Sequence, residues 1–418
     1  MKIEEIAYAS KEIVARIEGF IKRPKRNYRV AIMRAAASSF LLGLTSQYNS
    51  IYTVALGASK IQLGSISSIG NGVSALISAP LGWLVDRYGL KRFYLMGIGL
   101  TAGAMLVYAT APDWKAIIVA VFIMSLSMRL IGTGCSVICA DSLEKKDRAT
   151  GQNLCGTLQR LSALLSPMIA AFLVTAFGGI SVKGIRPLYH IRFVGYIFIL
   201  LFVAAKLREP QRMKMSEEEG EKSFTRDFRR IFEHSSDLRR WIAIASLTQF
   251  PMALTIPFLP LFAKEVKGAD QFVLGGMATA STAIYLLFGI PMGRLADRIG
   301  RKRVIYLTTP LWYISNLLLV FSTSSTTLII AGAFQSFYFI SSIVTSSMTL
   351  ELVPVAQMGR WSGLIGFFRG LVAVPAPSIG GLIWREVGPA YVFLIPIAFD
   401  LFLRIPLLIT IPETLDRE

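Results

Sequence analysis

The sequence predicts an all-α integral membrane protein with twelve transmembrane helices in two pseudo-symmetric six-helix bundles. Three observations lead to this fold class: an apolar composition, a series of long apolar segments, and a short basic motif that occurs twice. The 418 residues are 53% hydrophobic, with a mean hydropathy of +0.55. A soluble domain of this size does not need so much apolar surface.

The repeated motif reads GWLVDRYGLKR from Gly82 to Arg92 and GRLADRIGRKR from Gly293 to Arg303. Its two aspartates, Asp86 and Asp297, lie 211 positions apart. At this offset identical residues meet those at Leu63, Gly64, Leu76, Pro80, Gly82, Leu84, Asp86, Arg87, Gly89, Lys91 and Arg92. A repeat of this length and register predicts two homologous halves.

The apolar segments justify the helices in order, because a membrane-spanning helix needs about 20 mostly apolar residues. Most of them are too long and too uniformly apolar for strands of a β-barrel. The predicted spans are 29–54, 61–85, 92–111, 114–140, 151–178, 188–207, 241–263, 271–296, 303–322, 326–353, 359–384 and 388–411.

These spans predict five regions. They are a cytoplasmic N-terminal segment at 1–28, a first bundle at 29–207, a polar cytoplasmic linker at 208–240, a second bundle at 241–411 and a tail at 412–418. Within the first region, residues 3–21 show helical spacing of isoleucines, which favours either an amphipathic helix on the membrane surface or a solvated helix packed on the loops.

The basic residues predict the orientation. With the N-terminus inside, 31 of the 44 Lys and Arg lie on the cytoplasmic side, eight lie outside and five lie within spans. This asymmetry follows the positive-inside rule, so both termini are expected in the cytoplasm. Because the basic residues gather in short loops, the net charge of +18 does not indicate nucleic-acid binding.

Both copies of the motif resemble the signature loop of the major facilitator superfamily (MFS), G-x-L-x-D-R-x-G-R-K, found between helices 2 and 3 and between helices 8 and 9. The first copy departs from it only at Leu90. The resemblance implies the MFS fold and a cytoplasmic latch, with Asp86 facing the start of helix 11 and Asp297 the start of helix 5. The latch residues are Gly82, Asp86, Arg87, Gly89, Lys91, Gly293, Asp297, Arg298, Gly300 and Lys302.

Arginines within the spans are the first site candidates, since buried charges in membranes tend to line water-filled paths. Arg129 lies in helix 4, which the family arrangement places at the central cavity, and in proton-coupled members such an arginine is tied to coupling; packing against carbonyls is the alternative. Arg160 and Arg369 occupy equivalent places and could hold an anion from both sides, or each could snorkel or bind the opposite half. Arg34 is expected to snorkel.

Asp400 is the only acid near a membrane centre, and Arg404 lies four residues on, where the two can pair on one helical face. Asp400 is therefore either a coupling residue or part of a self-neutralised pair. Prolines are expected to break helix 7 (Pro251, Pro257, Pro260) and to kink helices 5 and 11 (Pro167, Pro375, Pro377). Further cavity candidates, each of which could instead hold helices together, are Gln47, Asn49, Asn71, Gln249, Tyr285, Asn316, Gln335 and Tyr338.

Other functional classes find little support in the sequence. A phosphate-binding loop of the G-x-x-x-x-G-K-[ST] type is missing, so ATP drive is not expected. The three cysteines, Cys135, Cys139 and Cys155, lack metal or disulfide spacing and are interpreted as packing residues. With only two histidines and no catalytic constellation, we expect neither an enzyme nor a cofactor or metal.

The sequence thus favours a secondary active transporter that moves a small organic solute by alternating access in the cell membrane. The predicted partners are that solute, a coupling proton or other ion, and lipids, and the expected state is a monomer. The spans hold five arginines against one acid, Asp400, so the substrate is expected to be anionic or zwitterionic. The alternatives are a proton-coupled exporter of hydrophobic drugs and a receptor or scaffold that transports nothing.

Overall fold

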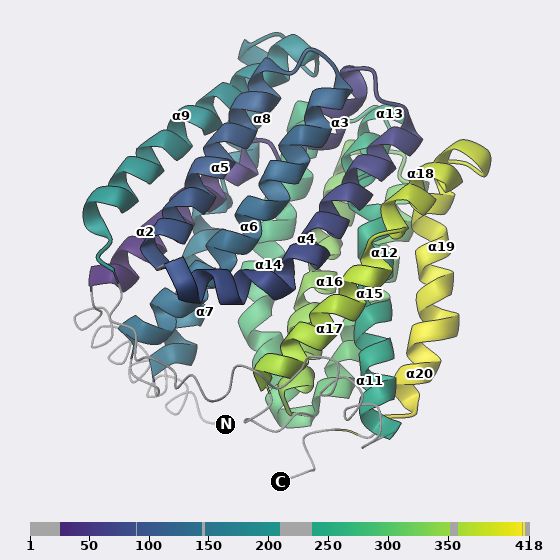
Figure 1. Cartoon of the computed structure of the whole chain (residues 1–418). Coiled ribbons are helices and arrows are strands. Elements are labelled where there is room, and N and C mark those ends of the chain that lie inside the picture. The colour runs from purple at the N-terminus through teal and green to yellow at the C-terminus, as the bar shows by residue number, and fades with distance from the viewer. Residues whose placement is uncertain are drawn as a thin grey trace, which may run out of the picture.

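The computed structural model describes residues 26–88, 90–143, 147–209, 236–351, 358–411 and 413, and all statements below refer to these. The amphipathic segment predicted at 3–21 lies outside them, as does most of the linker. The described chain is helical, in two bundles that lie side by side (Figure 1).

The first bundle precedes the linker and the second follows it. The first comprises α2 (Arg26–Gly43), α3 (Asn49–Ala55), α4 (Lys60–Tyr88), α5 (Leu90–Thr110), α6 (Trp114–Ser142), α7 (Arg148–Ala163), α8 (Ser166–Ala176) and α9 (Val182–Lys206). The second comprises α11 (Ser236–Leu247), α12 (Gln249–Thr255), α13 (Leu259–Glu265), α14 (Gln271–Ile299), α15 (Arg301–Phe321), α16 (Ser325–Glu351), α17 (Met358–Ala373), α18 (Ala376–Glu386), α19 (Tyr391–Phe399), the π-helical turn η4 (Asp400–Arg404) and α20 (Ile405–Ile409).

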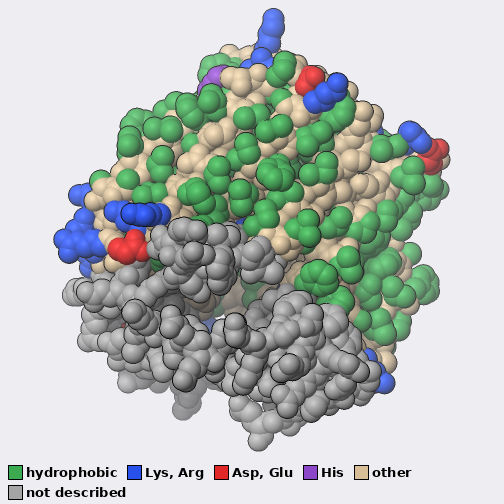
Figure 2. All heavy atoms as spheres, viewed as in Figure 1, with side chains coloured by type: hydrophobic (Ala, Val, Ile, Leu, Met, Phe, Trp, Pro, Cys, Tyr) green, Lys and Arg blue, Asp and Glu red, His purple; other side chains and the backbone are tan. Residues whose placement is uncertain are grey.

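The helices suit a multi-pass membrane protein. Ten described helices or joined helix pairs are long and apolar enough to cross a membrane; α2 with α3, and α4, take the places of the first two predicted spans. Hydrophobic side chains cover the middle of the visible face, while most of its charged side chains gather toward its ends (Figure 2). The expectation of twelve transmembrane helices in two bundles is confirmed.

Four transmembrane passages are interrupted. Helix 1 breaks at the turn 44–48, helix 5 breaks between α7 and α8, helix 7 breaks at 248 and at 256–258, and helix 11 breaks at 374–375. Pro167, Pro260 and Pro377 stand in the first turn of α8, α13 and α18, where the absent N–H costs nothing. The breaks expected from the prolines are confirmed. The turn at 44–48, which interrupts the predicted span 29–54, contains no proline and was not predicted.

The two halves pack through α4 against α17 and α18, and through α8 against α14. A Cβ atom at Gly64 would overlap with the carbonyl oxygen of Pro377, and one at Gly275 would lie 2.9 Å from that of Pro167. Gly64 and Gly275 are equivalent at the offset of 211 residues. Close backbone contact across the interface therefore gives a physical reason for this part of the repeat.

Candidate functional site: a cavity between the halves

A cavity of about 520 Å³ lies where the two halves meet. It is lined from both sides, by α2, α7 and α8 of the first half and by α14 and α16 of the second. Both helix breaks of the first half reach it, through Gly43 and Ser46 and through Pro167. The lining is rich in hydroxyl groups and contains no acidic residue among those described: Ser39, Leu42, Gly43, Ser46, Gly156, Gln159, Arg160, Ala163, Pro167, Ala278, Ser281, Thr282, Tyr285 and Phe339.

Arg160 and Tyr285 meet across the interface at this cavity. The Cζ atom of Arg160, on α7, lies 3.3 Å from the ring centroid of Tyr285, on α14. A guanidinium stacked on a ring keeps its in-plane N–H donors available for a further ligand. Two of the predicted cavity residues are thus brought together, and the only charged side chain of the described lining is a cation.

Arg369, the counterpart of Arg160, lies elsewhere. Its Nε donates to the backbone oxygen of Ala245 on α11 of the same half, 3.2 Å away, and it does not belong to the described cavity lining. The expected pair of arginines around one ligand is therefore not formed. The offset explains the difference, because Ser74 stands in α4 where Tyr285 stands in α14, and a serine offers no ring for stacking.

Three polar candidates of the first half join helices instead of lining the cavity. Gln47 donates to the backbone oxygen of Pro167 at 3.1 Å and so connects the breaks in helices 1 and 5. Asn49 accepts from the hydroxyl of Tyr189 at 2.8 Å. Asn71 donates to the backbone oxygen of Ala373 at 2.9 Å, across the interface between the halves.

The remaining uncharged candidates are also outside the described lining. Tyr338 donates its hydroxyl to the backbone oxygen of Thr248, and Gln335 accepts from Ser315 at 2.9 Å. Asn316 is fully buried in α15, and Gln249 begins α12 half-buried. Arg129 has an exposed side chain on α6 and is not part of the cavity lining.

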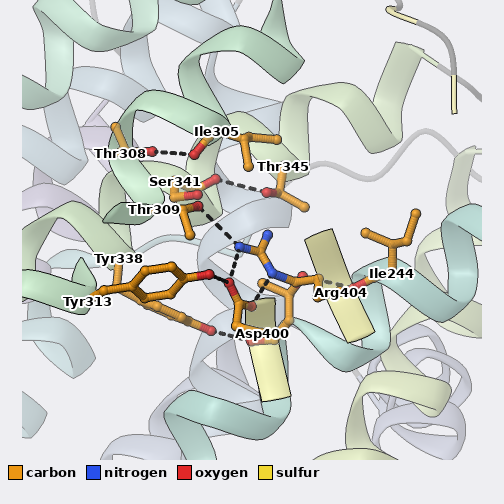
Figure 3. A network of polar contacts seen from close by, with 11 residues as sticks. Ile244, Ile305, Thr308, Thr309, Tyr313, Tyr338, Ser341, Thr345, Asp400 and Arg404 are labelled. Atoms are coloured by element: carbon orange, nitrogen blue, oxygen red, sulfur yellow. Dashed lines mark hydrogen bonds and ion pairs between the residues drawn. The ribbon is translucent and has the colours of Figure 1, made fainter. Parts of the chain in front are cut away.

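Asp400 forms the predicted pair with Arg404 inside η4. Arg404 donates from Nε to Oδ1 of Asp400 and from Nη2 to Oδ2, the second bond being 2.8 Å long. Tyr313 donates to Asp400 at 2.5 Å, and Arg404 also reaches Thr309 at 3.1 Å (Figure 3). Because both charges are buried and paired away from the cavity, the arrangement favours a structural role over a coupling role.

Two other arginines differ from expectation. Arg34 is only 7% exposed and lies over the ring of Tyr94, so the prediction that it snorkels to the surface is wrong. Arg192 falls among the eight basic residues assigned to the outside, because it stands only four residues after the predicted start of the sixth span at 188. The helix α9 begins at Val182, which places Arg192 well inside the membrane with 1% exposure.

The second copy of the latch motif is held within its own half. Asp297 pairs with Arg301, the first residue of α15, and its side chain is 61% exposed. Gly300 ends α14 with a φ of 106°, a conformation that favours glycine. Lys302 donates to the backbone oxygens of Ile409 and Ile411. Gly293 and Arg298 lie on the last turns of α14.

The first copy is described only in part. Gly82, Asp86 and Arg87 lie in α4, but their side chains are outside the described residues, as is all of Gly89. Lys91 is half-buried in the first turn of α5. The expected meeting of Asp86 with helix 11 therefore lies outside the described residues, and that of Asp297 with helix 5 stays a prediction.

Two glutamates that the sequence analysis did not select bind the backbone of the two signature loops. Glu209, after α9, accepts from the backbone N–H of Leu90 at 2.8 Å and of Lys91 at 3.3 Å. Glu413, after α20, accepts from the backbone N–H of Arg301 and of Lys302, both at 3.0 Å. A carboxylate at a helix N-terminus satisfies free N–H groups and the helix dipole. The sequence signal that could have identified these two residues is an acidic residue just after the last helix of each half.

Polar contacts join the halves at the upper end of Figure 1, where α3 and α13 lie. Lys60 pairs with Glu265 at 2.6 Å and lies 5.9 Å from the ring of Trp384. Two hydrogen bonds also join the halves, one between Gln271 and Thr175 at 2.8 Å and one between Ser68 and Ser378 at 2.8 Å. The second of these lies nearer the middle of α4. These contacts close the upper side of the interface above the cavity.

The comparisons with known proteins agree with this architecture. Residues 30–276 and 241–417 match the model of the Major Facilitator Superfamily. The crystal structure of the nucleoside transporter NupG superimposes with a TM-score of 0.75 at 14% identity, over 93% of this chain and 100% of that one, which supports the fold alone. The chain belongs to the major facilitator superfamily, and the resemblance seen in the signature loops is confirmed.

Curated relatives include resistance proteins. Multidrug resistance protein MdtG of Dickeya zeae (strain Ech586) is 23% identical over 290 residues, 67% of this chain and 68% of the relative. Tetracycline resistance protein, class B, of Escherichia coli is 24% identical over 156 residues, 37% of this chain and 39% of the relative. An uncharacterised MFS-type transporter of Mycobacterium tuberculosis (strain CDC 1551 / Oshkosh) is 30% identical over 144 residues, which span only 20% of its length. The matched stretches span between 20% and 68% of the length of these relatives.

Proposed function

We propose that this transporter carries a small anionic or zwitterionic organic solute, bound in the cavity between the halves with Arg160 as its principal anchor. The observation that carries the proposal is the stacking of Arg160 on Tyr285 in a cavity whose described lining has no acid. Guanidinium donors bind carboxylate or phosphate in a fork. The hydroxyl groups of Ser39, Ser281 and Thr282 suit polar parts of such a solute.

A cationic substrate fits this site poorly. Two unit charges about 4 Å apart interact by about 4 kcal/mol at an effective dielectric near 20. Arg160 would therefore repel a bound cation, and the described lining offers no carboxylate to offset that repulsion. Asp400 cannot serve, because its two oxygens already bind Arg404 and Tyr313.

The transport cycle is proposed to be alternating access in the cell membrane, with both termini in the cytoplasm. In that orientation the end joined by Lys60 and Glu265 faces outside, so the described conformation is closed to the exterior. Single cysteines at Ser181→Cys and Thr323→Cys should react with an impermeant thiol reagent from outside, and Ser223→Cys only from inside. Labelling of Ser223→Cys from outside would contradict this orientation.

A proton-coupled exporter of hydrophobic drugs is the second candidate. It is supported by the similarity to multidrug resistance protein MdtG over two thirds of the chain and by the aromatic lining of Tyr285 and Phe339. The two candidates differ in the sign of charge they accept, since Arg160 disfavours cationic drugs.

Flux into proteoliposomes tests the proposal. Labelled organic anions should accumulate inside or exchange across the membrane, and uptake should fall when Arg160→Gln is reconstituted. Uptake of cationic dyes at the same rate in the native protein and Arg160→Gln would favour the drug exporter, and binding without any flux would favour a receptor.

A further inference from the structure

The last helix of each half carries one arginine buried deep in the membrane. Arg192 lies on α9 and is 1% exposed, and Arg404 lies in η4 and is 4% exposed. Ten residues separate Arg192 from the start of α9 at Val182, about 15 Å along the helix axis. A guanidinium stays protonated in proteins, so each of these charges needs compensation at that depth.

Arg404 is compensated by an acid of its own helix. Its Nε and Nη2 donate to the two oxygens of Asp400. These two nitrogens form one edge of the planar guanidinium, which matches the fork of a carboxylate. Figure 3 shows this arrangement, with Thr309 and Tyr313 completing the hydrogen bonds.

The same edge of Arg192 has no protein ligand among the described residues. Nη1 donates to the hydroxyl of Thr45, whereas Nε and Nη2 are buried without a hydrogen-bond partner. Leu188 stands four residues before Arg192, where Asp400 stands before Arg404. The ring of Tyr196, 5.9 Å from Cζ, offers only a weak cation–π contact.

The helices around Arg192 also lack a compensating charge. α9 packs against α2, α3, α5 and α8. None of these five helices contains an aspartate or a glutamate, and neither does the turn at 44–48. Among the described residues, the acids of the first half are confined to helix ends and loops: Asp86, Asp113, Asp141, Asp147 and Glu209.

We propose that the Nε–Nη2 edge of Arg192 is an internal binding site for a small monovalent anion, either a halide or an oxyanion of the size of formate or nitrate. The anion takes the place that the Asp400 carboxylate holds beside Arg404. Because Arg192 is 1% exposed, no open path from solvent reaches its guanidinium, so the proposal is restricted to small ions. Thr45, the protein partner of Arg192, lies in the turn that interrupts helix 1, next to the cavity residue Ser46. By holding Arg192 in place, the bound ion stabilises the conformation of this turn.

Thermal unfolding of the full-length protein in detergent tests this site. Potassium gluconate, whose anion is too bulky to enter, is replaced at constant ionic strength by chloride, nitrate or formate. The native protein should show a saturable rise of the unfolding midpoint by roughly 2–4 °C. Comparing the halide with the two oxyanions identifies which class binds more tightly.

Four variants distinguish an anion bound at Arg192 from a general effect of salt on stability. Arg192→Met should lose the anion response, and Leu188→Asp should lose it too, because the new carboxylate copies Asp400 and fills the fork. Leu188→Asn, the uncharged control, and Arg160→Gln, in the cavity, should both keep the response. The proposal is overturned if the native protein does not respond, if Arg192→Met or Leu188→Asp still responds, or if the response disappears in Arg160→Gln.

Discussion

Arg160 and Arg369 occupy equivalent places in two halves of common ancestry, yet the structure gives them different surroundings. Arg160 stacks on Tyr285 of the opposite half and lines the cavity, whereas Arg369 is bound to a backbone oxygen of its own half. The residue on the facing helix accounts for the different surroundings of the two arginines. α14 supplies Tyr285 opposite Arg160, whereas α4 has Ser74 at the matching position. The two halves thus share their arrangement of helices, while the different residues at one interface position, Ser74 and Tyr285, make their surroundings chemically distinct.

The strongest way to test this comparison is to remove each arginine in turn. Arg160→Gln should weaken the apparent affinity for an anionic substrate by about 10- to 100-fold, because a charge-assisted hydrogen bond contributes about 1.5–3 kcal/mol. Arg369→Gln should leave the apparent affinity within about threefold and instead lower thermal stability, since among the described contacts it loses the hydrogen bond to Ala245, which lies outside the cavity lining. Transport kinetics and unfolding midpoints of both variants check this; equal losses of affinity would contradict the asymmetry.

The equivalent glycines should show a matched effect on the conformational equilibrium. Gly64→Ala places a methyl group against Pro377, and Gly275→Ala places one less tightly against Pro167. Both variants should favour a state open at the upper end, Gly64→Ala more strongly. Labelling of Ser68→Cys by an impermeant thiol reagent measures this opening.

Gly103→Ala is the control for those variants, because a Cβ atom there meets nothing within 4 Å. If labelling rises equally in Gly103→Ala, close backbone contact at the interface does not set the equilibrium.

The ring of Tyr285 should matter less than the charge it positions. Tyr285→Leu should raise the apparent KM for an anionic substrate about three- to tenfold, since cation–π contacts contribute about 0.5–2 kcal/mol. Tyr285→Phe keeps the ring and should remain within about twofold of the native protein. A Tyr285→Phe variant as weak as Tyr285→Leu would show that the hydroxyl, not the stacking, does the positioning.

The latch residues should give the smallest effect in the described conformation. Asp297 is largely exposed and pairs only with neighbouring Arg301 among its described contacts, and an exposed pair contributes about 0.2–1 kcal/mol. Asp86→Asn and Asp297→Asn should therefore fold normally and reduce transport a few-fold by weakening the outward-open state. Normal transport with an unchanged distribution between inward- and outward-open states in both variants would rule out the latch.

Much of the fold follows from local sequence, because apolar length, basic loops and prolines act locally. The motif repeat and the prolines at 167, 260 and 377 identified the two bundles and three of the helix breaks. The break at 44–48 was missed because its cause is tertiary: Gln47 binds Pro167, and Thr45 binds Arg192. Arg192 was missed because Lys183, Arg186 and Pro187 concealed the start of α9.

The site was harder to predict than the fold. Arg160 and Tyr285, two of the residues singled out from the sequence, line the described cavity. The sequence could not distinguish Arg160 from Arg369, since their own helices resemble each other. Most polar candidates proved to join helices, as Asn71 does across the interface. Which of these roles a polar side chain takes depends on the facing helix, and that information is not local.

The sign of the bound charge tests the central claim most directly. Equilibrium binding of a panel of small carboxylates and of cationic dyes should be measured on the native protein and on Arg160→Gln, with Arg369→Gln as control. The account predicts that carboxylates bind the native protein and Arg369→Gln, and bind Arg160→Gln at least about tenfold more weakly. Tight binding of a cationic dye to the native protein, unaffected by added anions and not improved in Arg160→Gln, would contradict it.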